Sequence, residues 1–216
     1  MLRPLALLTL AAAMACARHD DDLPAAAPAA APPAFDLNRI DQSRQMGSPS
    51  AKVWFIMGSD FQCPYCKAFH DETWGKINDE YVKTGKVRVA FLNHPMDFHP
   101  RAVPAAEAAM CAGAQDRFWV MHDSLFANQE KWVGAADPQP IFEGLAKSIG
   151  LEVGSWKSCV TSHATRTQVE ADYQRTKQVG IKGTPSFVIG DSLSIVGAAP
   201  FADFKKAIDA ALARAK

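Results

Sequence analysis

Two cysteines separated by two residues, in the stretch SDFQCPYCKAFH, stand where one structural pattern changes into another. Residues 53–60 form a short, continuous apolar run with β-branched and aromatic members, which predicts a buried strand. Pro64 then suits the first position of a helix, and apolar residues recur at helical spacing as far as Ile77. The sequence therefore predicts a strand-to-helix turn, with Cys63 and Cys66 in the first turn of the helix.

The rest of the chain continues as an alternation of strands and helices. Gly85 is expected to end the first helix, and Gly150 and Gly180 to end later ones. The periodicity predicts a strand at 86–95, helices between 100 and about 179, a strand at 181–190 with LSIVG as its hairpin partner, and a helix at 200–216. This order predicts an α/β fold with a helical block inside it.

The composition limits the size of the fold and the class of partner. With 216 residues, 48% of them hydrophobic, the chain can bury one good core, so we expect one domain or one domain carrying an insertion. Lys plus Arg and Asp plus Glu both number 23, which gives a formal net charge of zero. Without a basic surface field, we expect no nucleic-acid partner.

The N-terminus has the pattern of an export signal. Residues 1–15 place Arg3 before a short apolar run that ends in small residues, which is typical of a secretory signal peptide. The run stops directly before Cys16, so the pattern leaves open lipidation of Cys16, as in bacterial lipoproteins, or ordinary cleavage near Ala17. Residues 16–34 are rich in Pro and Ala and predict an extended tether. We therefore expect a periplasmic or other extracytoplasmic protein, with a lipid anchor as one alternative.

The cysteine pair admits three interpretations: a redox couple, part of a metal site with His70, or an inert cross-link. At a helix start, unpaired N–H groups and the helix dipole stabilise a thiolate on Cys63, and Cys66 lies one turn later on the same face. A structural zinc site would need a fourth ligand, and no second CxxC or HxxxH supplies one. The pattern favours a redox couple in which Cys63 is the nucleophile and Cys66 the resolving cysteine, and we assign no metal ligands and no cofactor.

Three stretches taken together resemble one family. SDFQCPYC, the run AAEAAMCAGAQDRFWVMHDSLF and the stretch VGIKGTPSFVIG look like those of exported DsbA-like thiol:disulfide oxidoreductases, in the family's order. The resemblance extends from about Phe35 to the C-terminus. It implies a thioredoxin-like fold, formed by residues 35–98 and 180–216, with an inserted helical domain at 99–179.

The resemblance also implies roles for residues around the cysteines. Thr184 and Pro185 are expected to form the cis-proline loop against the active-site disulfide, where the backbone of Thr184 can pair with an extended substrate segment. Pro64 and Tyr65, between the cysteines, tune the reduction potential. One departure is Met57, which stands where relatives often carry a buried acid. Asp60 could take over proton handling, although we interpret it as a solvated turn residue.

The other motifs receive structural interpretations. Cys111 and Cys159 both fall in apolar helical patterns, and in an oxidising compartment we favour a structural disulfide over two buried thiols. Phe118, Trp119 and His122 lie on a stripe typical of a core. We assign neither these residues nor His99 a catalytic role.

The combined expectation is a dithiol oxidase that introduces disulfides into thiol-containing exported proteins. The resemblance implies reoxidation by a quinone-linked membrane partner, and we expect a monomer. One alternative is a disulfide isomerase or reductase, although the short tether leaves no room for the N-terminal dimerisation domain that such isomerases usually carry. An alternative of another class is a metal-binding or metallochaperone module that uses the CxxC pair.

Overall fold

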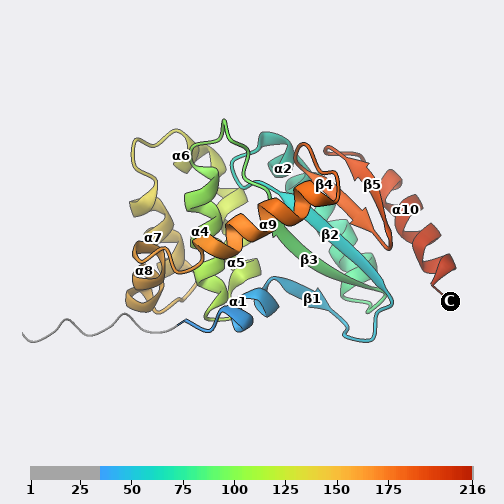
Figure 1. The fold of residues 1–216 in the computed structure, drawn as a ribbon, viewed down its shortest axis with the longest axis horizontal. Coiled ribbons are helices and arrows are strands. Elements are labelled where there is room, and N and C mark those ends of the chain that lie inside the picture. Colours follow the sequence, from blue (N-terminus) through green and yellow to red (C-terminus); the bar gives the residue numbers. More distant parts are fainter. Residues whose placement is uncertain (1–34, 216) are drawn as a thin grey trace, which may run out of the picture. The chain divides into compact units, whose positions relative to one another are not determined.

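A computed structural model describes residues 35–215 of the chain. The predicted signal peptide, the tether and Cys16 lie outside these residues. The described part contains a five-stranded sheet in the order β1-β3-β2-β4-β5 (Figure 1). Its strands are β1 (Gln45–Gly47), β2 (Val53–Ser59), β3 (Val87–Asn93), β4 (Ser186–Ile189) and β5 (Ser192–Val196). β2 and β3 run parallel, whereas the other neighbouring pairs are antiparallel, so the predicted α/β class is confirmed.

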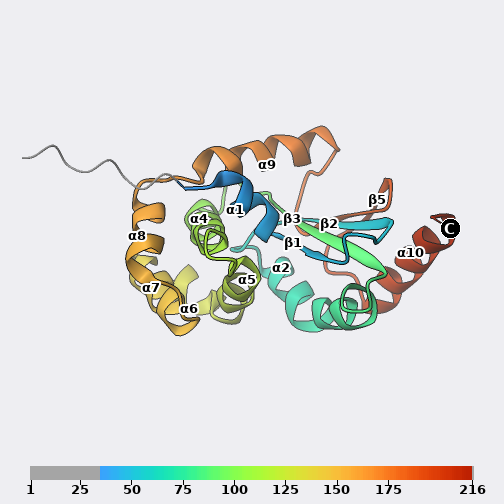
Figure 2. The same cartoon turned by 90° about the horizontal axis from the view of Figure 1, so that it is seen from below.

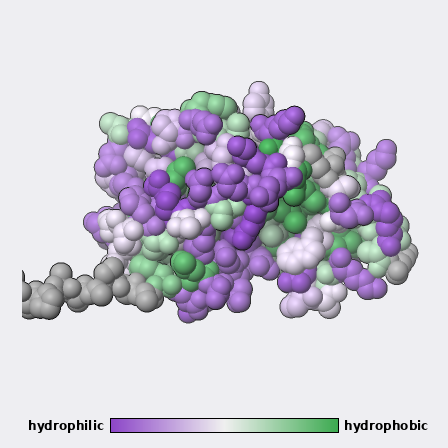
Figure 3. Space-filling model, viewed as in Figure 1, coloured by the Kyte–Doolittle hydropathy of each residue, from purple (hydrophilic) through white to green (hydrophobic). Residues whose placement is uncertain are grey.

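The sheet has helices on both faces. Helix α9 (Arg166–Gln178) lies on one face, and α10 (Phe201–Arg214) lies on the other together with the helical segment that follows β2 (Figure 2). Under α10, Phe55 of β2 packs within ring-contact distance of Phe187 and Phe204, at centroid separations of 5.5 and 6.0 Å. On the opposite face, Figure 3 shows hydrophilic side chains over α9 and hydrophobic ones over the strands beside it.

The segment after β2 is one helical run that changes its winding. It consists of α2 (Pro64–Phe69), the π-helical turn η1 (His70–Trp74), α3 (Gly75–Ile77) and a second π-helical turn η2 (Asn78–Val82). π-helical turns inside α-helices often occur at functional sites. Gly85, at φ 75°, follows in the left-handed region that ends helices, as the sequence predicts.

Between β3 and β4 the chain contributes helices alone. They are α4 (Ala102–Gly113), α5 (Phe118–Ala127), α6 (Gln129–Val133), α7 (Gln139–Ser148), α8 (Val153–Thr161) and α9. Cys111 of α4 and Cys159 of α8 form a disulfide with Cα atoms 5.7 Å apart. Helix α9, which the sequence assigns to the helical insertion, packs directly against β3 of the sheet. The expected boundary between the insertion and the thioredoxin-like part near residue 179 stays a prediction. Within residues 35–215, no helix has the length and apolarity to cross a membrane.

Two short elements at the start of the described region escaped the sequence analysis. Helix α1 (Leu37–Ser43) is capped by Asp36, whose carboxylate accepts hydrogen bonds from the N–H groups of Asn38 and Arg39. Strand β1 has only three residues and pairs antiparallel with the edge of β3. The two elements are too short to show a hydrophobic periodicity in the sequence. Their secondary structure therefore depends on contacts with distant parts of the chain.

Candidate active site

Cys63 stands at the junction between β2 and α2. It is the N-cap residue of α2 with extended backbone angles, and Pro64 occupies the first helical position. The N–H of Cys63 donates to the carbonyl oxygen of Asp60 at 3.1 Å, which closes the preceding turn. Cys63 and Cys66 are both buried free thiols, whereas Tyr65 between them is 66% exposed. The site thus presents an aromatic side chain to solvent next to a largely covered sulfur.

The loop before β4 supplies the second wall of the site. The peptide bond between Thr184 and Pro185 is cis, and the Sγ of Cys63 lies 3.4 Å from the carbonyl oxygen of Thr184. Since a carbonyl oxygen can only accept, this hydrogen bond belongs to the protonated thiol. Three of the expected residues, Cys63, Thr184 and Pro185, are therefore neighbours although they lie far apart in the sequence.

The two sulfurs differ strongly in acidity. A hydrogen bond from the Cys66 side chain is the main reason why the pKa of Cys63 falls to about 6. The side chain of Thr184 and the backbone N–H groups of Cys66 and Tyr65 also lower this pKa, against the effect of burial. Burial, followed by the neighbouring Cys63, raises the pKa of Cys66 well above its ordinary value. The reactive species of a cysteine is the thiolate, and these pKa shifts favour a thiolate at Cys63 and a protonated thiol at Cys66.

Asp60 is not the solvated turn residue that the sequence analysis expected. It is only 2% exposed, and its carboxylate accepts hydrogen bonds from the N–H groups of Gln62 at 2.7 Å and Met96 at 2.9 Å and lies 2.6 Å from Nδ1 of His99. The backbone N–H of Asp60 points to the Sγ of Cys66 at 3.5 Å. The interpretation was wrong because the loop after β3 covers this carboxylate, and the sequence does not show that loop's position.

The end of β2 carries Met57 where relatives often carry a buried acid, and Ser59 two positions later. Met57 is buried on β2 opposite Phe91 and Phe187, so no carboxylate occupies that position. A hydrogen bond from the buried Ser59 side chain instead acts to lower the pKa of Cys66, although burial outweighs it. The hydrogen bonds that lower the pKa of Cys66 therefore come from neutral donors, the Ser59 side chain and the backbone N–H of Asp60.

The helical block also reaches the site, through a residue that the sequence analysis did not single out. The amide nitrogen of Gln129, buried at the start of α6, donates to the carbonyl oxygens of Phe61 at 2.7 Å and Cys63 at 3.1 Å. These bonds hold the turn that carries Cys63. A glutamine at the start of a short helix has no sequence pattern that would have revealed this role.

The alternative metal set of Cys63, Cys66 and His70 does not assemble. His70 turns away from the thiols, with Nδ1 2.9 Å from a carboxylate oxygen of Asp71 and Nε2 3.2 Å from one of Asp123. Among residues 35–215, the side chains grouped closely enough to hold one metal ion are His70, His122 and Asp123, and neither cysteine belongs to that group.

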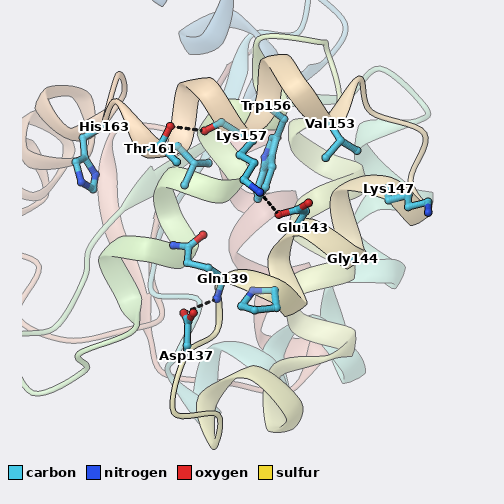
Figure 4. Close-up of a pocket in the computed structure, with 12 residues that line it drawn as sticks. Asp137, Gln139, Glu143, Gly144, Lys147, Val153, Trp156, Lys157, Thr161 and His163 are labelled. Atoms are coloured by element: carbon cyan, nitrogen blue, oxygen red, sulfur yellow. Dashed lines mark hydrogen bonds and ion pairs between the residues drawn. The ribbon is translucent and has the colours of Figure 1, made fainter.

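A pocket elsewhere on the molecule is separate from the thiol site. It has a volume of about 750 Å³ and is lined by residues of α7 and α8, among them Trp156 and the ion pair between Lys157 and Glu143 at 2.9 Å (Figure 4). Asp137 and Gln139 form its lower rim. Its lining contains no cysteine, so it offers no thiol chemistry.

Comparison with known proteins agrees with this geometry. Residues 40–210 match the family model described as Thioredoxin. Disulfide bond formation protein D of Bacillus subtilis is 26% identical over 172 residues, which cover 76% of this chain and 74% of that protein. The probable disulfide bond formation protein D of Bacillus anthracis is 25% identical over 169 residues, which cover 77% and 76%.

Solved structures resemble the fold over most of its length. BdbD from Bacillus subtilis in its oxidised form superposes with a TM-score of 0.72 at 24% identity and covers 83% of this chain and 96% of that one. Wolbachia pipientis alpha-DsbA1 superposes with a TM-score of 0.69 at 23% identity and covers 80% and 92%. The expected thioredoxin-like fold is confirmed.

Proposed function

The chain belongs to the thioredoxin family and is a DsbA-like protein thiol:disulfide oxidoreductase, and from that premise we propose that it introduces disulfides into exported proteins through Cys63 and Cys66. The observation that carries the proposal is the acidity of the helix-capping Cys63, whose pKa is about 6, beside a buried Cys66 whose pKa is raised. This pair provides a good leaving group and nucleophile at Cys63 and a protonated partner at Cys66.

The reaction starts from the Cys63–Cys66 disulfide. A substrate thiolate attacks the Sγ of Cys63, the bond between the two cysteines breaks, and its electron pair goes to Cys66, which takes up a proton because burial disfavours its thiolate. A mixed disulfide now joins the substrate to Cys63. A second substrate thiolate attacks the substrate sulfur of this bond and releases Cys63 as a thiolate. The substrate loses two electrons and gains a disulfide, while the enzyme is reduced to the dithiol.

The direction follows from the relative stability of the two enzyme forms. A low pKa at Cys63 stabilises the reduced form, which makes the disulfide form a stronger oxidant. The apolar Met57 acts in the same direction, since a buried carboxylate there would oppose the anion at Cys63. These features support an oxidase over the alternative of an isomerase or reductase.

Substrate recognition uses the backbone next to Pro185. The carbonyl oxygen of Thr184 is within hydrogen-bond distance of Cys63, so an extended segment that pairs with Thr184 lies within reach of the sulfur. The exposed Tyr65 offers an apolar surface on the other side. Recognition through the main chain tolerates many substrate sequences, which suits a protein that acts on unfolded chains.

The proposed reaction needs an extracytoplasmic location for the protein and a partner that reoxidises its cysteine pair. An export signal at residues 1–15 takes the protein to an extracytoplasmic compartment, where the Pro/Ala-rich tether holds the domain away from a membrane if Cys16 is lipidated. Thiol-containing exported proteins are the substrates. A membrane partner linked to quinone accepts the electrons from the reduced enzyme.

The deciding experiment is the reduction potential of the Cys63–Cys66 couple, measured by equilibration with glutathione buffers and trapping of free thiols. The oxidase proposal predicts a potential well above the glutathione pool, with most of the protein reduced in buffers that leave ordinary structural disulfides intact. A potential near or below that pool assigns the protein to the reductases or isomerases instead. The Cys63→Ser variant is the control, because it removes the couple and leaves the Cys111–Cys159 disulfide.

A further inference from the structure

A cluster of two imidazoles and a carboxylate lies beside the active-site helix and takes no part in the thiol chemistry. His70 is the first residue of η1, four positions after Cys66 on the same helical run. His122 and Asp123 come from α5 in the helical block. The cluster therefore joins two segments of the fold that are more than fifty positions apart in the sequence.

The three possible ligand atoms lie close enough together to hold one metal ion. One carboxylate oxygen of Asp123 lies 2.8 Å from Nδ1 of His122 and 3.2 Å from Nε2 of His70, and all three atoms lie within 4.8 Å of one another. A tetrahedral ion with bonds of about 2.1 Å places its ligands about 3.4 Å apart. Small side-chain adjustments would bring an ion into bonding distance of all three atoms.

The surroundings hold the two imidazoles in place. His122 is buried and makes edge contacts with the rings of Phe91 and Phe126, at centroid separations of 5.3 and 5.0 Å. His70 stacks on Phe126 at 5.1 Å. An apolar, rigid wall on one side means that little conformational entropy is lost when the imidazoles bind an ion.

A carboxylate next to the cluster orients one of the two imidazoles, as is usual for histidines that bind a metal ion. Nδ1 of His70 lies 2.9 Å from Asp71, so the opposite ring nitrogen is presented to the cluster in a fixed orientation. Lys67, the nearest cation on the same helix, is engaged by the other oxygen of Asp71 at 2.6 Å. The side chain of Asp123 is 56% exposed, which leaves a route for an ion to enter from solvent.

We propose that His70, His122 and Asp123 bind one divalent transition-metal ion of the zinc type, with the remaining coordination position open to water. The donor set of two imidazoles and one carboxylate suits such an ion, whereas calcium and magnesium prefer oxygen ligands alone. The ion links the helix that carries Cys66 to α5, and binding stabilises the folded chain by mass action. The site is distinct from the cysteines, so it extends the proposed function without depending on it.

The test is a titration of the oxidised, tag-free full chain with Zn²⁺ in a calorimeter and with Co²⁺ by visible absorption. Oxidation matters because a disulfide between Cys63 and Cys66 removes their thiolates as competing ligands. We expect one equivalent of Zn²⁺ to bind, and a tetrahedral Co²⁺ spectrum without a thiolate charge-transfer band. Asp123→Asn should weaken Zn²⁺ binding at least about tenfold, since even changes to outer partners of metal ligands have effects of that size.

A matched control comes from an imidazole–carboxylate pair outside the cluster, between His163 and Glu107. Nδ1 of His163 lies 3.1 Å from Glu107 without another histidine beside it, so His163→Gln should leave the affinity unchanged. His70→Gln serves as a second cluster variant, and thermal unfolding without metal establishes that each variant is folded. The proposal is overturned if the oxidised protein does not bind Zn²⁺ stoichiometrically, or if both cluster variants bind it as tightly as the wild type does. Neither result bears on the reduction potential of the cysteine couple, so the two proposals fail separately.

Discussion

The Sγ atom of Cys63 and the carbonyl oxygen of Thr184 lie 3.4 Å apart, although 121 positions separate the two residues in the sequence. One residue caps the helix after β2, and the other precedes β4, so the pairing of these neighbouring strands brings them together. In the proposed reaction, a substrate segment paired with the Thr184 backbone would lie within reach of the Cys63 sulfur.

Titration of the reduced protein should show a thiolate with a midpoint near pH 6, because hydrogen bonds lower the pKa of Cys63 to about that value. At pH 7 the thiolate should then outnumber the thiol by roughly ten to one. Thiolate absorbance in the ultraviolet measures this directly. Cys66→Ala should raise the midpoint by about one pH unit or more, since the hydrogen bond from Cys66 makes the largest contribution. Cys66→Ser, which keeps a hydroxyl donor, should shift it less, and equal midpoints in the two variants would contradict the assignment.

The stability of the reduced protein should rise between pH 6 and pH 9. Cys63 has a pKa of about 6 when folded and 9.0 as a model value, so in this window the unfolded chain binds more protons than the folded one. The contribution is complete above pH 9 and is lost as the pH falls through 6, with a slope of at most about 1.4 kcal/mol per pH unit. Denaturant unfolding of the reduced protein measures the slope. The difference from Cys63→Ala cancels the titration of the histidines, and a parallel pH dependence in the variant would refute the prediction.

Asp60→Asn should destabilise the protein by about 1 to 3 kcal/mol. The substitution removes the charge of a buried carboxylate that accepts two backbone hydrogen bonds and contacts His99, and an amide cannot satisfy all three partners. Urea unfolding at neutral pH is the measurement. Asp97→Asn, at an exposed position of the loop that covers Asp60, is the matched control and should change the free energy of unfolding by less than about 0.5 kcal/mol.

Removal of the Cys111–Cys159 disulfide should lower the free energy of unfolding by about 4 kcal/mol. The disulfide spans a sequence separation of 48 residues, and the loss of that constraint increases the entropy of the unfolded chain. The comparison is best made with Cys63 and Cys66 both replaced by Ala, so that one disulfide alone distinguishes the variants. If the double variant Cys111→Ala, Cys159→Ala has the same free energy of unfolding as its parent, the prediction is wrong.

The local features of the site could be predicted from the sequence for a clear reason. Pro64 at the first helical position and the apolar run before it depend on neighbouring residues, so the pattern alone predicts where β2 ends and α2 begins. The resemblance to a family added the loop at Thr184 and Pro185, which spacing could not have shown. The fold class also followed, because the order of strands and helices limits the topology.

The tertiary structure decided which polar groups surround the cysteines. Asp60 is buried because a loop after β3 folds over it, and Gln129 reaches the carbonyl oxygen of Cys63 from 66 positions away. His70 and Asp123 meet across 53 positions. The sequence determined the elements and the reactive pair, since these depend on local periodicity and turn chemistry. Burial, acidity and the imidazole cluster depend on how distant segments pack, and that is set only when the whole chain folds.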